Sequence, residues 1–199
     1  MIHSYSLNCY MEIKLQPPGA GLPKPELIIA RIMFRTRCAL TNYQSYLKLF
    51  TEERAKIRKR CSNLSDDDAK ARVLIKRLSG LEDSSRYWSV YMTLDHLRIV
   101  NISIADIIAK LSSGIKPEGA AITAAVKPSE QVTSSIITGC ESSCDLVHKA
   151  LSNANNKISS TTFPHPWFGE ITYQNWAALV GSHMGIHRKQ INSILDAKN

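Results

Sequence analysis

Two histidines, His183 and His187, stand four residues apart in the segment Gly-Ser-His-Met-Gly-Ile-His-Arg near the C-terminal end of the sequence. Side chains at positions i and i+4 of an α-helix project from the same side, so the two imidazoles can share one metal ion. His96 lies in a second helical pattern, among apolar residues at helical spacing. Three neutral imidazoles that meet inside a helical protein would form a metal site with open positions for water or substrate. The alternative is three core histidines with hydrogen-bond partners, and the last helix lacks the glutamate of a His-Glu-x-x-His protease motif.

The cysteines offer a second, weaker metal-binding pattern. Cys140, Cys144 and His148 follow one another at four-residue steps, so they could face one pocket from a single helix. Two small side chains on one apolar helical stripe explain the same spacing. The chain has five cysteines, an odd number, and no leader segment is recognised, which indicates reduced thiols and predicts a cytoplasmic location.

These histidines must be positioned by helices. Apolar residues recur at three- and four-residue steps in four long stretches, and candidate capping residues stand at the ends of several of them, such as Ser89, Gly114 and Thr172. The predicted helices cover residues 25 to about 60, a shorter 66–78, 90–113, 130–155 and 173–196. Residues 113–131 are expected to form a loop with at most one strand, and residues 159–170 an aromatic and proline-rich loop.

The predicted fold class is all-α, a four-helix bundle. Prolines and glycines exclude a helix from residues 1–24, where residues 11–15 could form one short strand. The expected organisation is therefore an irregular N-terminal extension, residues 1–24, followed by one helical bundle domain, residues 25–199.

Composition excludes several classes of protein. The 199 residues are 44% hydrophobic and 21% charged, as in ordinary globular domains, and no apolar run is long enough for a membrane span. The formal charge is +8, with many of the cations between Lys48 and Arg77. Acidic residues interrupt that stretch and few aromatic residues interleave with it, so a solvated helix face is favoured over an anion-binding surface, and a nucleic acid is not the expected partner.

Two segments resemble a known family. The segment Tyr-Trp-Ser-Val-Tyr-Met-Thr-Leu-Asp-His-Leu (87–97) is similar to the Trp-Ser-x(6)-His-Leu opening of the second helix in the DinB/YfiT-like superfamily. The segment from His165 to Trp176, with its Pro-Trp-Phe-Gly loop, followed by His183-x-x-x-His187, resembles the closing half of that family. The order and separation of the helices also match, from residue 25 to residue 196.

The resemblance implies a four-helix bundle of DinB/YfiT-like type, often a homodimer, whose metal ligands would be His96, His183 and His187. Zinc, nickel, iron and manganese are all compatible, because a three-imidazole site selects weakly among divalent metals. Members of the superfamily include transferases and isomerases that use low-molecular-weight thiols, and metal-dependent hydrolases. No residue is identified as a general base, since Asp95 points about 100° away from His96 on a helix and Glu170 is near only in sequence.

Two function classes follow. The first is a metal-dependent thiol transferase or hydrolase that acts on a small electrophilic molecule, its substrate choice set by residues 113–131 and the N-terminal extension. The second is a non-catalytic metal-binding or stress-response bundle, which predicts a saturated coordination shell with no pocket beside the ion. A weaker third class, an accessory protein that binds nucleic acid through the face between Lys48 and Arg77, predicts steep salt dependence.

Overall fold

The computed structural model describes residues 13–198, which form six α-helices, two 3₁₀ turns and two small β-hairpins. The α-helices are α1 (Lys24–Leu40), α2 (Tyr43–Cys61), α3 (Asp66–Lys70), α4 (Val90–Ser112), α5 (Ile136–Ala154) and α6 (Tyr173–Asp196). The 3₁₀ turns are η1 (Asp83–Ser85) and η2 (Thr123–Val126), and the paired strands are β1 (Val73–Leu74) with β2 (Tyr87–Trp88) and β3 (Thr162–His165) with β4 (Gly169–Thr172). None of the described helices is long and apolar enough to cross a membrane.

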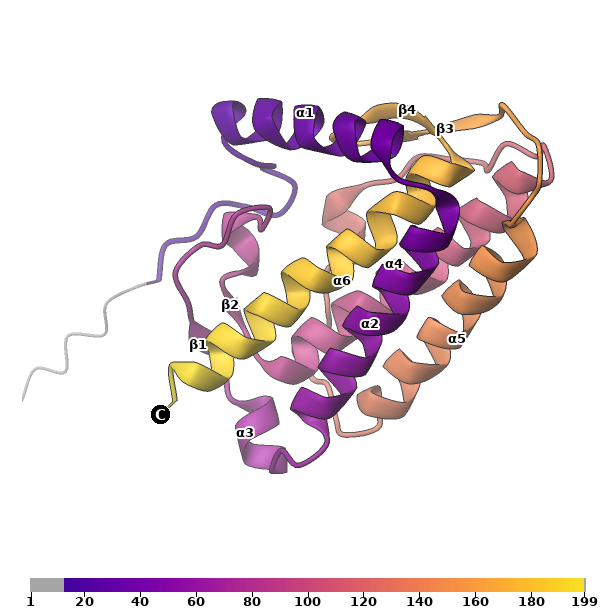
Figure 1. The fold of residues 1–199 in the computed structure, drawn as a ribbon. Coiled ribbons are helices and arrows are strands. Elements are labelled where there is room, and N and C mark those ends of the chain that lie inside the picture. Colours follow the sequence, from indigo (N-terminus) through magenta and orange to yellow (C-terminus); the bar gives the residue numbers. More distant parts are fainter. Residues whose placement is uncertain (1–12, 199) are drawn as a thin grey trace, which may run out of the picture.

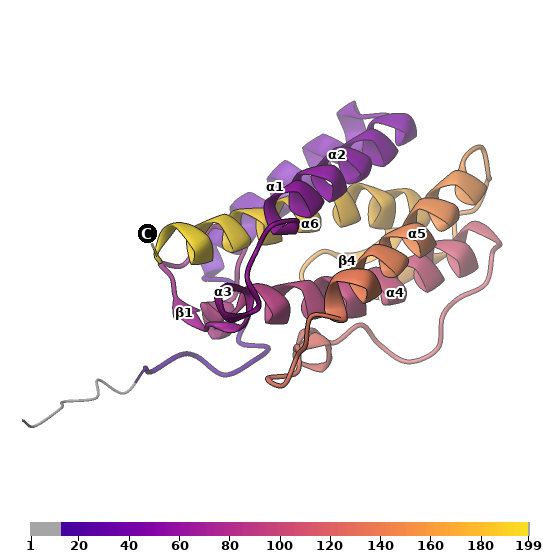
Figure 2. The ribbon, with the colours of Figure 1, turned by 90° about the horizontal axis from the view of Figure 1, so that it is seen from below.

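Helices α2, α4, α5 and α6 form a four-helix bundle (Figure 1), which confirms the predicted fold class. Around the bundle, α2 contacts α6 and α5, and α4 contacts α5 and α6. The shared core contains fully buried residues from all four helices, including Phe50, Leu97, Leu151 and Ile191. A second view of the molecule shows the same four long helices (Figure 2).

Side-chain contacts give the direction of each helix pair. Along α2 and α6, Glu53 meets Arg188 and Arg60 meets Asp196, so these two helices run parallel. Helices α4 and α6 run antiparallel. Ser85 and Trp88, which precede α4, contact Gln190 and His187, whereas His96 within α4 contacts the earlier residue His183.

The helices α4 and α5 also run parallel. Arg98 lies against Gly139, and Asn101 donates hydrogen bonds to Ser143 and Cys144. Residue numbers therefore increase in the same direction along the two helices. Parallel neighbours need a connection that returns along the full length of the helix, which explains the long segment 113–135. That return path brings residue Val126 back beside the first turns of α4.

Three predicted helix boundaries are wrong. The expected helix over 25–60 is two helices, because Thr41 is extended and Asn42 caps α2 by accepting a hydrogen bond from the Ser45 amide, at 2.9 Å. The short helix predicted to reach residue 78 ends at Lys70, because the next residues leave helical geometry and pair as β1 with β2. Helix α5 begins at residue 136 instead of 130.

The segment before α5 is tethered to α4. The Ser129 amide donates a hydrogen bond of 2.9 Å to the Asp95 carboxylate, and residues 130–135 contain bends and a turn before α5 begins. The loop predicted over 159–170 contains the hairpin β3–β4, and residues 113–131 contain the 3₁₀ turn η2 and no strand. The strand expected at 11–15 falls partly outside the described residues, and residues 13–15 are not in a strand.

The two longest correct predictions are the helices that carry the histidines. Ser89 caps α4 by accepting a hydrogen bond from the Met92 amide, at 3.1 Å, and Gly114 follows its end with a positive φ of 76°. Thr172 precedes α6, and the Asn175 side chain accepts a hydrogen bond from the Thr172 amide, at 3.3 Å. Capping of this kind satisfies backbone groups that a helix terminus leaves without partners.

Helix α1 is not part of the bundle core. It lies across one end of the bundle (Figure 1), contacts α6, and has no buried residue along its described length. This position leaves a space between α1, α4, α6 and residues 120–127.

Candidate metal centre

The structure brings together the three histidines that the sequence singled out. His96 comes from α4, and His183 and His187 come from successive turns of α6. One ring nitrogen from each histidine lies within 4.8 Å of the others, and this is the one group of three or more such side chains found among residues 13–198. The ring centroids are 4.5 Å apart for two pairs and 5.1 Å for the pair of His96 and His183.

The ring of His96 is held by the loop that returns past α4. Its Nδ1 lies 2.7 Å from the carbonyl oxygen of Val126. A carbonyl oxygen only accepts hydrogen bonds, so Nδ1 carries the proton and donates it. The Nε2 lone pair of neutral His96 is therefore free and directed toward the other two histidines, since Nε2 lies 3.1 Å from Nε2 of His183.

The ring of His187 is held in the same way by a longer relay. Its Nδ1 lies 2.7 Å from Oε1 of Gln190, whose Nε2 donates a hydrogen bond of 2.7 Å to the Ser85 carbonyl. The Ser85 carbonyl accepts only, which fixes the orientation of the amide and makes its oxygen the acceptor for His187. His187 therefore also carries its proton on Nδ1. Trp88 stacks on this ring with 6.3 Å between centroids and 11° between planes.

His183 has the least support of the three. Its Nδ1 is buried and has no hydrogen-bond partner among the described residues. In the absence of an ion, its Nε2 must donate to His96, because the Nε2 of His96 has a lone pair and no proton. A neutral ring with one orphaned nitrogen, beside two rings of fixed tautomer, is a donor set that fits a transition metal.

Burial keeps the cluster neutral. It lowers the pKa of His96 to about 4, although the hydrogen bond to Val126 opposes this effect. Burial also lowers the pKa values of His183 and His187 well below the ordinary value, and repulsion from the neighbouring imidazoles adds to it. Neutral imidazole is the form that binds metals, so no imidazolium has to lose a proton before metal binding near neutral pH.

The three histidines lie in the wall of a cavity of about 1020 Å³. Apolar side chains of α1, α4 and α6 line much of it, and residues 120–123 and 125–127 close one side. Leu22, which precedes α1, also lines it, so both the segment before α1 and the segment 113–131 contribute residues to the cavity wall.

Three functional contacts were not identified from the sequence. Val126, Gln190 and Ser85 orient the imidazoles, and only Gln190, three residues after His187 on the same helix, carried a local signal. A fourth histidine, His165 on β3, also lines the cavity. Burial lowers its pKa to about 4, and its Nδ1 accepts a hydrogen bond of 3.0 Å from the Trp167 amide, which leaves the proton of the neutral ring on Nε2.

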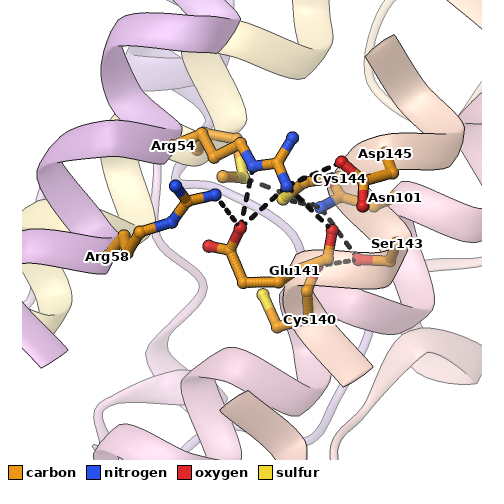
Figure 3. Close-up of polar contacts among 9 residues, drawn as sticks. Arg54, Arg58, Asn101, Cys140, Glu141, Ser143, Cys144 and Asp145 are labelled. Carbon is orange, nitrogen blue, oxygen red and sulfur yellow. Dashed lines mark hydrogen bonds and ion pairs between the residues drawn. The ribbon is translucent and has the colours of Figure 1, made fainter. Parts of the chain in front are cut away.

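The alternative cysteine site does not form. Cys140 and Cys144 are buried in α5, but His148 is exposed on the same helix and does not join them. Figure 3 shows what surrounds the pair instead: Asn101 donates to Cys144 at 3.4 Å, and Arg54 of α2 binds Glu141 and Asp145 of α5. This polar seam joins helices of the bundle. Cys38 and Cys61 are also free thiols, and Cys9 lies outside the described residues.

Carboxylates near the histidines in sequence are engaged elsewhere. Asp95 accepts hydrogen bonds from Arg98 and the Ser129 amide, and Glu170 lies on β4 and does not line the cavity. The basic stretch from Lys48 to Arg77 is largely paired within the molecule, with ion pairs to acidic residues from Lys48, Arg54, Lys56, Arg58, Arg60, Lys70, Arg72 and Arg77.

Fold and site together define a four-helix bundle that carries a three-histidine cluster capable of holding a metal ion. Among solved structures, the chain is similar to the crystal structure of TT2238, a four-helix bundle protein, with a TM-score of 0.56 and 16% sequence identity. The match covers 76% of this chain and 98% of that one. At this identity the likeness shows the fold alone. No family model matches the chain, and no curated protein matches it.

Proposed function

We propose that this protein is a metal-dependent enzyme of the DinB/YfiT-like type, in which His96, His183 and His187 hold one divalent transition metal ion. The observation that carries the proposal is the orientation of the imidazoles. His96 and His187 each donate the Nδ1 proton to an oxygen acceptor 2.7 Å away. In both rings the Nε2 lone pair is left available to a metal ion. Such outer partners, which fix the tautomer of a ligand, are typical of histidine metal sites.

The cavity favours an enzyme over a purely structural or sensory metal site. A structural ion is enclosed by its ligands, whereas catalytic sites keep a position open to a substrate or water. Here the three histidines lie in the wall of a space large enough for a small molecule. A divalent ion held by three neutral ligands keeps its full charge and acidifies a bound water or thiol.

The reaction class follows from that chemistry and from the resemblance. A bound thiolate or hydroxide would attack an electrophilic small molecule, which corresponds to a thiol transferase or a hydrolase. His165 is a neutral donor on the wall of the same cavity and is suited to orient a polar group of the substrate. In the same proposal residues 25–199 form the DinB-like domain, residues 1–24 are an extension of it, and the protein functions in the cytoplasm, where a homodimer is expected.

The metal content of the purified protein tests the proposal. Wild type should contain about one equivalent of zinc, nickel, iron or manganese per chain, or take it up after addition. The double variant His183→Ala, His187→Ala should lose it, while His148→Ala, which removes an exposed histidine, should keep it. If wild type binds none of these metals, the proposed function is wrong. If it does bind one, thiol-transfer and hydrolase substrates should be screened with that metal.

A further inference from the structure

Some of the charged residues that line the cavity have a partner of opposite charge or a hydrogen-bond partner, and others do not. Arg77 pairs with Glu26, and Glu82 accepts hydrogen bonds from two backbone amides, of Gly19 and Gly21. Arg37 differs from these residues. Within the described chain its guanidinium forms no ion pair, and its buried Nε has no hydrogen-bond acceptor.

Among residues 13–198, the one aromatic ring beneath the Arg37 guanidinium belongs to Tyr46, and it does not supply a counter-charge. The guanidinium carbon lies 5.9 Å from the ring centroid of Tyr46. A cation placed in the wall of a largely apolar cavity without an anion pays a desolvation cost that an anionic ligand group would offset. The planar guanidinium matches a carboxylate particularly well, because the two groups can form paired hydrogen bonds.

Three apolar side chains that line the same cavity are more than half exposed to solvent. Ile29, Met33 and Ile122 line it and are 57%, 66% and 58% exposed. Ile29 and Met33 are four residues apart on α1, and Arg37 follows at the same spacing, so the three form one stripe along the helix. The stripe therefore presents an apolar surface that ends in a cation.

The two ends of the cavity are separated along α6. Cys38, next to Arg37, lines one small pocket together with Asn175, which lies in the first turn of α6. His183 is eight residues further along that helix, which at the rise per residue of an α-helix is about 12 Å. A molecule that reaches both Arg37 and the histidines must have roughly that length.

We propose that the cavity binds an amphipathic monocarboxylate, with the carboxylate on Arg37, an extended apolar body against Ile29 and Met33, and its other end at the three-histidine centre. The inference rests on the proposed function, because it names the class of molecule that would approach the metal. It makes Arg37 the residue that selects acids over neutral or cationic molecules of the same shape.

Binding of decanoate to the zinc-loaded full chain tests this. Calorimetry or tryptophan fluorescence should show saturable binding of decanoate, with decanol and decylamine at least about tenfold weaker, as expected when a hydrogen-bonded charge pair is lost. The variant Arg37→Gln should bind decanoate about tenfold or more weakly than wild type and should bind decanol with unchanged affinity. Arg35→Gln is the matched control, because Arg35 is exposed on the same helix and does not line the large cavity.

Two further variants keep the test decisive. Ala30→Trp fills the cavity from α1 without changing any charge, so it should abolish decanoate binding even if Arg37→Gln fails to fold. Lys127 is a second cavity cation without an ion pair in the described chain, located beside the Val126 contact to His96. Decanoate binding that is lost in Lys127→Gln but unchanged in Arg37→Gln would overturn the assignment of the carboxylate.

The remaining outcomes separate this inference from the proposed function. Normal zinc content with no decanoate binding, or with decanol bound as tightly as decanoate, overturns the inference and leaves the metal site standing. Absence of zinc with binding that depends on Arg37 overturns the proposed function and supports the carboxylate subsite. A dimer by light scattering that binds no decanoate would assign the apolar stripe of α1 to a second copy of the chain and overturn the inference.

Discussion

The relay from His187 through Gln190 to Ser85 gives the sharpest prediction about the metal centre. Gln190 is fully buried, and both ends of its amide are engaged at 2.7 Å. Gln190→Met keeps a side chain of similar length and removes both hydrogen bonds. The Nδ1 proton of His187 and the Ser85 carbonyl then lose their partners inside the core.

Two magnitudes follow from this geometry. Each buried polar group left without a partner costs about 1–3 kcal/mol, so the metal-free variant should unfold with a free energy lower by about 2 kcal/mol or more. Loss of an outer partner of a histidine ligand weakens metal binding by about 10- to 100-fold, because the ring is no longer held in one tautomer and orientation. The second effect is specific to a metal ligand.

Urea unfolding of the metal-free protein and zinc affinity by chelator competition measure the two effects separately. Lys189→Met is the control, since Lys189 is exposed on the same helix and should change neither quantity. A variant that is destabilised as expected but binds zinc as tightly as wild type would refute the reasoning, because it would show that Gln190 supports the fold and not the ligand.

Two other predictions concern the packing of α2 on α6. Burial alone would raise the pKa of Glu53, but its hydrogen bonds and ion pairs with Arg188 and Lys56 together outweigh burial and lower the pKa. The contribution of Glu53 to stability is therefore present above the pKa of the unfolded state and should be lost as the pH falls through the lower, folded-state pKa. Urea unfolding at decreasing pH should show this loss, and Glu53→Gln should reduce the pH dependence; an unchanged slope would contradict it. A Cβ added at Gly181 would lie 3.0 Å from Leu49 and 3.2 Å from a backbone nitrogen, so Gly181→Ala should cost about 1–3 kcal/mol in unfolding free energy. Gly185→Ala, whose Cβ would be 3.6 Å from its nearest neighbours, should instead be neutral or more stable by up to about 1 kcal/mol, and equal effects at both sites would show that close packing is not the cause.

Only the tertiary structure determined the outer contacts of the site and its cavity. Val126 is 30 residues from His96, and Ser85 is 105 residues from Gln190, so no local pattern relates them. The return of residues 113–135 along α4 follows from the parallel packing of α4 and α5, which is a property of the assembled core. The break at Thr41 and Asn42 was missed because the apolar spacing continues across it, although the asparagine was a capping signal.

The sequence by itself determined the parts that depend on neighbouring residues. Helical periodicity and the caps at Ser89 and Thr172 located α4 and α6, and the four-residue step placed His183 and His187 on one side of a helix. Those rules act within one or two turns, where the backbone geometry of a helix is nearly constant. Which helices meet, how the loops return, and which carbonyl oxygen a buried imidazole finds depend on packing between distant segments, and these features required the folded chain.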